Sequence, residues 1–129
     1  MKIADHYENS IVVSKEMLAN AVGSGEVDVF ATPMMVALME NTAAKCVADS
    51  LEKGQTTVGT SIHVTHCAAT PEGMKVTCEA IVTEIDKRTI TFHVSASDEC
   101  GIIGEGTHTR VIVDKDRFEK KAASKLQKD

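Results

Sequence analysis

Residues 30–54, FATPMMVALMENTAAKCVADSLEKG, form the stretch that decides the fold. Thr32 is a favourable N-cap, Pro33 suits the first helical position, and Gly54 can end a helix in the left-handed conformation. Between these signals the helix is apolar on nearly every side, which is typical of a helix buried in its domain. We therefore predict one long central helix around which the other elements are arranged.

Glu40 is the residue that does not fit this apolar helix. At about 100° per residue, Lys45 and Asp49 lie about 140° and about 180° from Glu40 around the helix axis. The solvent-facing side that these two residues share is therefore not the side of Glu40, and we expect Glu40 to point inward. A carboxylate in apolar surroundings costs several kcal/mol unless it is paired, protonated or functional. Glu40 is thus the first candidate site residue.

Length and composition exclude several classes of function. The chain of 129 residues predicts a single domain, residues 1–129, with one core. The net charge of -5 and an aromatic content of 3% argue against a nucleic-acid partner. The sequence contains neither a membrane span of about 18 apolar residues nor the apolar run of a signal peptide, so we expect a cytoplasmic protein with no membrane partner. The four cysteines lack CxxC spacing, which favours reduced, buried thiols over disulfides or a zinc site.

The rest of the chain predicts an antiparallel sheet and hence the α+β class. A first strand over residues 6–13 is followed by a loop with room for one helical turn. Four further strands are expected over residues 57–69, 75–85, 89–97 and 102–113, and a short charged helix over residues 116–128. A single sheet that curls round a helix apolar on all sides cannot enclose it. We therefore expect dimerisation through the sheet edge or through the open side of the helix.

Strand alternation separates two of the histidines. Within residues 57–69, His66 falls on the apolar face, whereas His63 and Gly59 fall on the polar face. An inward His66 and an inward Glu40 could hold a water or substrate proton between them, with the carboxylate orienting the ring. A buried Glu–His hydrogen bond kept for packing is the alternative. Because His63 and His66 lie on opposite faces, no metal site is predicted for them.

Thr32 and the glycines add further candidates. The helix start near Thr32 offers free N–H groups that could stabilise a developing oxyanion, in addition to the capping role. Gly59 indicates a β-bulge or a close backbone approach, and Gly104 and Gly106 in the last strand are interpreted in the same way. An acid, an imidazole and a helix start together suit acyl transfer to water.

Three motifs together resemble the hotdog-fold thioesterases of the fluoroacetyl-CoA thioesterase-like group. They are ATPMMVALME (31–40), VGTSIHVTHCAATPEGM (58–74) and GEGTHTRVIVDKDRF (104–118). The match covers about residues 28–119. The resemblance implies a hotdog dimer that hydrolyses acyl-CoA thioesters, with coenzyme A present only as part of the substrate. It places Thr32, Glu40 and His66 at the positions of the catalytic threonine, glutamate and histidine of that group, and Gly59 at its substrate-contacting glycine.

The same resemblance bears on substrate and assembly. Fluoroacetyl selectivity in that group is associated with an aromatic lid upstream of the threonine, whereas residues 23–29 here read GSGEVDV. A short or medium acyl-CoA is therefore the expected substrate. Thr32 and Glu40 lie eight residues apart, about 12 Å by helical rise. This distance is too long for a direct hydrogen bond within one subunit. We therefore expect that the site is shared between subunits of a homodimer or of a dimer of dimers, or that His66 bridges the gap between Thr32 and Glu40.

Two other functions are compatible with these residues. An enoyl-CoA hydratase or dehydratase of the same fold also uses a histidine and a carboxylate. A non-enzymatic acyl-CoA binding module would bind the ligand without turnover.

Overall fold

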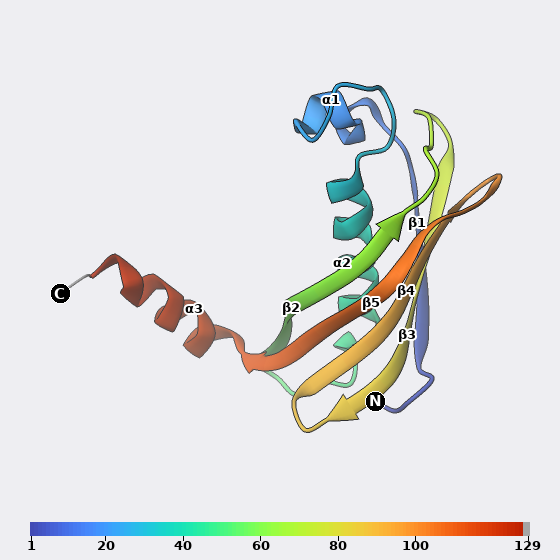
Figure 1. The fold of residues 1–129 in the computed structure, drawn as a ribbon. Coiled ribbons are helices and arrows are strands. Elements are labelled where there is room, and N and C mark those ends of the chain that lie inside the picture. Colours follow the sequence, from blue (N-terminus) through green and yellow to red (C-terminus); the bar gives the residue numbers. More distant parts are fainter. Residues whose placement is uncertain (128–129) are drawn as a thin grey trace.

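A curved antiparallel sheet wraps a central helix in the computed structural model, which describes residues 1–127 (Figure 1). In chain order the elements are β1 (His6–Val12), the 3-10 turn η1 (Lys15–Met17), α1 (Ala19–Val22), α2 (Thr32–Ala48), β2 (Gln55–His66), β3 (Lys75–Asp86), β4 (Thr89–Asp98), β5 (Gly101–Asp114), α3 (Lys115–Ala123) and η2 (Ser124–Leu126). Every strand that the sequence predicted is present, and the ends differ by at most three residues.

The order of strands in the sheet is β1-β3-β4-β5-β2. β2 pairs with β5 and not with β3, the strand that follows it in the sequence. The connection from β2 to β3 therefore runs from one edge of the sheet toward the opposite edge. β1 and β2 are consequently the two edges. The inner face of β4 carries Ile90, Phe92, Val94 and Ala96, all fully buried. Alternation along the strand brings these four apolar residues to one face.

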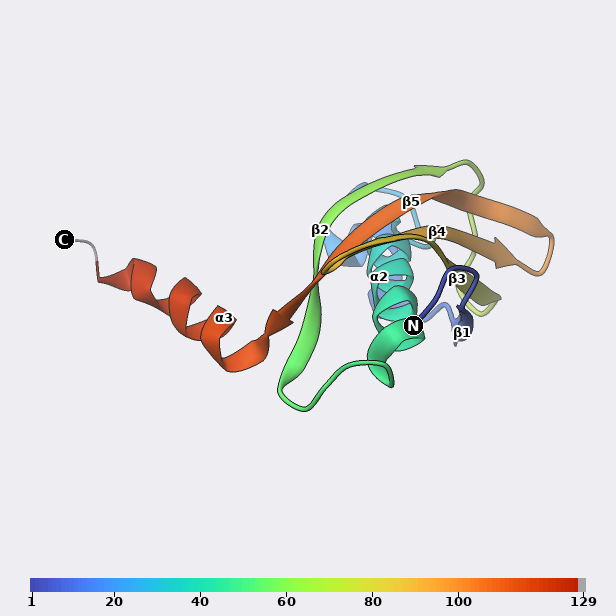
Figure 2. The same cartoon turned by 90° about the horizontal axis from the view of Figure 1, so that it is seen from below.

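α2 lies in the hollow of the sheet (Figure 2). Its buried residues are Met35, Leu38, Met39, Thr42, Ala43 and Val47. Complete burial of a methionine such as Met35 or Met39 contributes about 1.5–3 kcal/mol. The opposite side, including Pro33, Ala37 and Asn41, remains exposed. The prediction of burial on nearly every side is therefore wrong for one chain, because the sheet covers the helix from one side only.

Both ends of α2 differ from the prediction. The N-cap is Ala31, and Thr32 occupies the first helical position, where its hydroxyl makes no capping bond. The helix ends at Ala48, six residues before Gly54. Residues 48–50 are exposed, so packing no longer stabilises another helical turn. Gly54 does adopt a positive φ of 86°, but in the connection that leads into β2.

α3 extends away from the sheet and buries no residue (Figures 1 and 2). The Asp114 side chain caps it by accepting a hydrogen bond from the Arg117 amide at 3.0 Å. The predicted helix end at residue 128 lies outside the described residues. None of the helices in residues 1–127 combines the length and the apolar character needed to span a membrane.

The cysteines differ from the prediction in burial. All four are free thiols, but only Cys78 is buried, Cys46 is half-buried, and Cys67 and Cys100 are exposed. Burial raises the pKa of the Cys46 and Cys78 thiols. These two are therefore kept in the uncharged form.

Candidate active site

Thr32 and His66 form a hydroxyl–imidazole pair. Thr32 begins α2 and His66 ends β2, and the Thr32 Oγ1 lies 2.7 Å from His66 Nδ1. The hydroxyl that the sequence assigned to helix capping is thus bonded to an imidazole instead. A hydroxyl and an imidazole in contact are the usual elements of an activated nucleophile or of an oriented base.

The other ring nitrogen of His66 is free. His66 Nε2 is buried and finds no hydrogen-bond partner in the part of the chain that the structure describes. Burial lowers the pKa of His66, and the neighbouring Ala68 backbone opposes the shift. The ring is therefore neutral at pH 7 and can accept a proton. Thr32 and His66 also line a cavity of about 340 Å³, together with Ala19, Ser24, Gly25, Val27, Val29, Phe30, Ala31, Cys67, Ala68 and Ala69.

The helix start offers fewer donors than the sequence suggested. Pro33 has no N–H, and the amides of Met34 and Met35 both donate to the Ala31 carbonyl at 3.0 Å. Of the N–H groups at positions 32–35, only that of Thr32 donates to no backbone acceptor within residues 1–127. An oxyanion could receive that one N–H together with the Thr32 hydroxyl.

Glu40 lies apart from this pair. No hydrogen bond or ion pair joins Glu40 to His66 within residues 1–127, so the predicted contact is absent in one chain. The Glu40 Oε2 instead lies 3.9 Å from Arg110 Nη1. The Glu40 side chain is 43% exposed, so the expectation of a fully inward carboxylate is only partly met. The Glu40 carboxylate lies beside Gly59 of β2, the edge strand of the sheet, where α2 borders its exposed side.

Gly59 allows Glu40 to approach β2 closely. A Cβ at position 59 would lie 2.7 Å from Glu40 Oε2 and 3.1 Å from His108 Cε1. The register shifts between Gly59 and Ser61, which confirms the predicted bulge. Because the extra residue Thr60 reverses the alternation, Gly59 faces the helix. Its placement on the polar face was therefore wrong.

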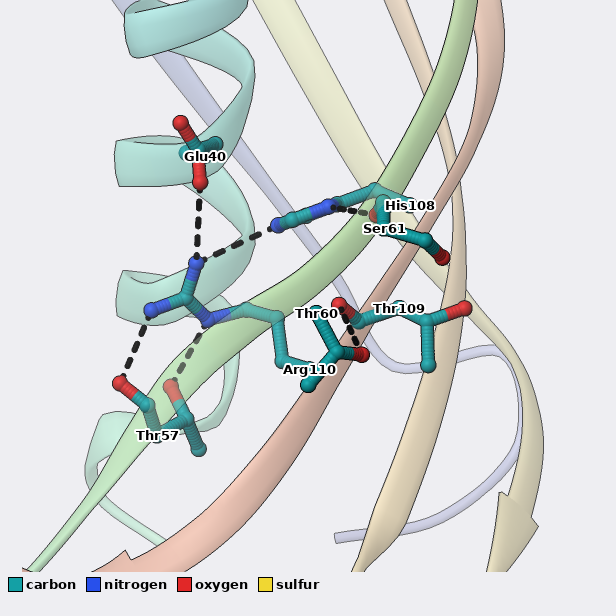
Figure 3. A network of polar contacts seen from close by, with 7 residues as sticks. All are labelled: Glu40, Thr57, Thr60, Ser61, His108, Thr109 and Arg110. Carbon is teal, nitrogen blue, oxygen red and sulfur yellow. Dashed lines mark hydrogen bonds and ion pairs between the residues drawn. The ribbon is translucent and has the colours of Figure 1, made fainter. Parts of the chain in front are cut away.

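Three residues of this region were not predicted as part of the site: Thr57, His108 and Arg110 (Figure 3). In a simple hairpin across the turn between β4 and β5, Phe92 would face residue 107. A second register shift, between Ala96 and Ser97, instead pairs Phe92 with His108. This one-residue slip moves His108 and Arg110 to the inner face. The signal available in the sequence was Gly104, beside the extra residue Ile103.

The remaining histidines lie elsewhere. His63 is exposed, on the opposite face of β2 from His66, as predicted. His93 Nε2 lies 3.4 Å from Glu105 Oε1 on the outer face of the sheet. In the described part of the chain, no group of three or more His, Cys, Asp or Glu side chains is arranged to hold a metal ion.

The geometry thus provides two separate units. One is a hydroxyl–imidazole pair beside a cavity, and the other is a half-exposed carboxylate held against β2. The first can move a proton, and the second can orient a base or attack a carbonyl.

Known proteins share both the sequence and the fold. The family of fluoroacetyl-CoA-specific thioesterases (FlK) matches residues 13–116. A fluoroacetyl-CoA thioesterase of Streptantibioticus cattleyicolor is 42% identical over 98 residues, which are 76% of this chain and 70% of that protein. The solved structure of the fluoroacetyl-CoA thioesterase FlK is 34% identical, with a TM-score of 0.93 over 97% of each chain. A thioesterase superfamily member from Thermus thermophilus is 26% identical, with a TM-score of 0.89 over 99% of this chain and 97% of the other. The predicted α+β hotdog fold and the resemblance seen in the three motifs are confirmed.

Proposed function

We propose that this chain, which belongs to the fluoroacetyl-CoA-specific thioesterase family, hydrolyses a short or medium acyl-CoA thioester to the free acid and coenzyme A. The observation that carries the proposal is the Thr32–His66 contact of 2.7 Å beside a cavity of about 340 Å³. We assign the hydrolase site to one hotdog domain spanning residues 1–129.

His66 is the base in this reaction. With Nδ1–H donating to Thr32 Oγ1, the lone pair of Nε2 is available to take a proton from water. The water oxygen bonds to the thioester carbon, and the carbonyl π electrons move onto its oxygen. When the tetrahedral intermediate collapses, the C–S bond breaks, and the protonated His66 returns the proton to the coenzyme A thiolate.

Thr32 stabilises the developing oxyanion. Its hydroxyl proton remains free to donate when Oγ1 accepts from His66, and its amide is the N–H without a backbone acceptor at the start of α2. Two such donors, aimed at one oxygen, lower the barrier because they meet charge that develops only in the transition state.

Glu40 completes the site from a second copy of the chain. Within one chain Glu40 lies eight helical residues from Thr32, about 12 Å along the axis, and its side chain is 43% exposed on the open side of α2. A homodimer that covers this side could bring the Glu40 carboxylate of one copy toward His66 of the other, with Gly59 near the bound substrate. Mixing inactive Glu40→Gln with inactive His66→Ala should restore part of the activity through hybrid dimers; no recovery contradicts the shared site.

The cavity supports a short or medium acyl chain. Its lining from residues 19–31 and 66–69 contains small side chains, and Phe30, the one aromatic among them, is fully buried. No aromatic side chain from residues 23–29 is available to close it. We therefore do not expect strict selectivity for the fluoroacetyl group.

The decisive experiment is a panel of acyl-CoA esters from acetyl to octanoyl, with fluoroacetyl and crotonyl esters, assayed for released thiol. Thiol release from short or medium saturated esters supports the proposal. Hydration of crotonyl-CoA without thiol release would indicate a hydratase, and tight binding without turnover would indicate a binding module. Intact-mass spectrometry during turnover should show no acylated protein, since water is the nucleophile.

A cytoplasmic location is part of the same proposal. The four free thiols suit a reducing compartment. Cell fractionation tests this placement.

A further inference from the structure

α3 carries positive charge on a protein that is otherwise acidic. Residues 115–125 contain five Lys or Arg and two Asp or Glu, whereas residues 1–114 contain eight Lys or Arg and sixteen Asp or Glu. α3 leaves the sheet beyond the edge strand β2 and buries no residue (Figures 1 and 2). Its side chains are therefore free to contact a ligand.

A cleft lies where β5 continues into α3. It has a volume of about 350 Å³, and its lining includes Gln55, Arg88, Ile112, Arg117, Phe118 and Lys121. Arg88 belongs to the turn between β3 and β4, so cations from two separate segments of the chain meet at this cleft. Three cations around one cleft suit a ligand that carries several negative charges.

The three cations of the cleft have no carboxylate partner. Within residues 1–127, no ion pair involves Arg88, Arg117 or Lys121. Nη1 of Arg88 donates to the Ile112 carbonyl at 3.3 Å, which holds this guanidinium beside β5. The one carboxylate in the lining, that of Asp114, accepts from the Arg117 amide at 3.0 Å. The cleft therefore has an excess of positive charge, and the fork of an arginine matches the oxygens of a phosphate.

The cleft is too far from His66 of the same chain to bind part of the same substrate molecule. Gln55 and His66 are the two ends of β2, which are about 36 Å apart along the strand at about 3.3 Å per residue. The pantetheine arm of coenzyme A has about thirteen bonds between its sulfur and the first phosphorus, the length of about four extended residues, or about 15 Å. The phosphates of a thioester at His66 therefore do not reach the cleft of that chain.

The cleft of a second copy lies within this reach. β2 is an edge strand, and a two-fold axis would pair its free side antiparallel with β2 of another copy. In the proposed shared site, Glu40 and the adjacent Gly59 of one copy approach His66 of the other. Gln55 precedes Gly59 by four residues, which places the cleft about 13 Å beyond His66 of the other copy. This distance is close to the span of the pantetheine arm.

We propose that this cleft binds the 3′-phosphate, diphosphate and adenine of a coenzyme A whose thioester lies at His66 of the second copy. The inference rests on the proposed function, in which two chains share one site. Arg88 and Arg117 bind phosphate oxygens, and Lys121 adds a third positive charge. Phe118, which is 46% exposed, provides a surface on which the adenine stacks. Because the nucleotide does not react, these contacts are equal in the ground and transition states and affect KM rather than kcat.

Shortened substrates test this assignment. Arg88→Gln and Arg117→Gln should each raise KM for acyl-CoA about fivefold, with kcat changed less than about twofold. Neither should change KM for the corresponding acyl-pantetheine, which lacks the nucleotide. Lys75→Gln removes an exposed lysine at the opposite end of β3 and is the matched control, which should change neither constant. An unchanged KM for acyl-CoA in both variants, or an equal rise for acyl-pantetheine, would overturn the proposal.

Hybrid dimers test whether the cleft serves the site of the other copy. A chain with Arg88→Gln and Arg117→Gln keeps His66, and a His66→Ala chain keeps the cations. In a coexpressed hybrid of the two, the intact His66 receives the intact cleft, so a fraction of the sites should have the wild-type KM for acyl-CoA. The absence of this fraction would overturn the proposal.

Calorimetry with adenosine 3′,5′-bisphosphate is independent of turnover. The wild type should bind this nucleotide, and the double variant should bind it about tenfold more weakly. Equal affinities would overturn the proposal. If the wild type releases no thiol from any ester but binds the nucleotide through the two arginines, the proposed function fails and the nucleotide cleft is supported. Thiol release with an unchanged KM in both variants supports the function and refutes the cleft.

Discussion

Gly59→Ala is the sharpest test of the carboxylate's position. The added Cβ would lie 2.7 Å from Glu40 Oε2, whereas ordinary contacts require more than 3 Å. The carboxylate must therefore retreat by about 0.5–1 Å. A displacement of about 1 Å from a productive geometry can cost about a hundredfold in rate. We expect kcat/KM to fall by about this factor.

The same substitution should hardly change stability. The ion pair between Glu40 and Arg110 is 3.9 Å long, and Glu40 is half-exposed. Such a pair contributes at most about 1 kcal/mol to the free energy of unfolding, and a longer distance removes only a fraction of that contribution. Gly59 does not have a positive φ, so alanine is tolerated there and lowers the entropy of the unfolded chain by about 0.4–1 kcal/mol. These terms oppose each other, and we expect the free energy of unfolding to change by less than about 1 kcal/mol.

The assay is thiol release from the best acyl-CoA substrate, paired with urea unfolding of each variant. Thr107→Ala, at an exposed position of β5, is the matched control and should change neither quantity. If Gly59→Ala keeps more than half of the wild-type kcat/KM, Glu40 does not need its place over Gly59. A loss of activity that only follows a large loss of stability would refute the reasoning equally.

The other predictions concern His66, Glu40 and pH. His66→Ala should lower turnover about a hundredfold, the scale expected for loss of a general base, while His63→Ala on the outer face keeps wild-type rates; an active His66→Ala would contradict its role. Glu40→Gln should be inactive but within about 1 kcal/mol of the wild type in urea unfolding, because a half-exposed ion pair adds little; marked destabilisation would favour a packing role. Burial lowers the pKa of His66 and His108 in the folded state, so the unfolded chain binds more protons as the pH falls below about 6.5. Stability should therefore decrease as the pH falls from about 6.5 toward the folded-state pKa values, and the acid limb of kcat/KM should have its midpoint below 6.5; a midpoint at or above 6.5 would contradict the neutral His66.

The histidine and carboxylate of the site could be identified from the sequence because local patterns carry the information. Glu40 interrupts an apolar helix, and His66 shares a strand face with apolar residues, so both stand out without knowledge of the fold. The pairing of Thr32 with His66 could not be identified in this way. A threonine before a proline at a helix start is read as a cap, and only the arrival of β2 beside that end of α2 provides its hydroxyl with another partner.

The sequence by itself determined the strands, the central helix without its exact ends, and the bulge at Gly59, since periodicity and glycine report on local backbone geometry. The tertiary structure decided the partner of Glu40. It did so through the pairing of β2 with β5 and through two one-residue register shifts, which turn Gly59, His108 and Arg110 inward. The physical reason is that side chains alternate between the two faces of a strand. Each extra residue between a given position and the turn therefore moves the side chain at that position to the opposite face. Register depends in turn on strands that meet only after the whole chain has folded.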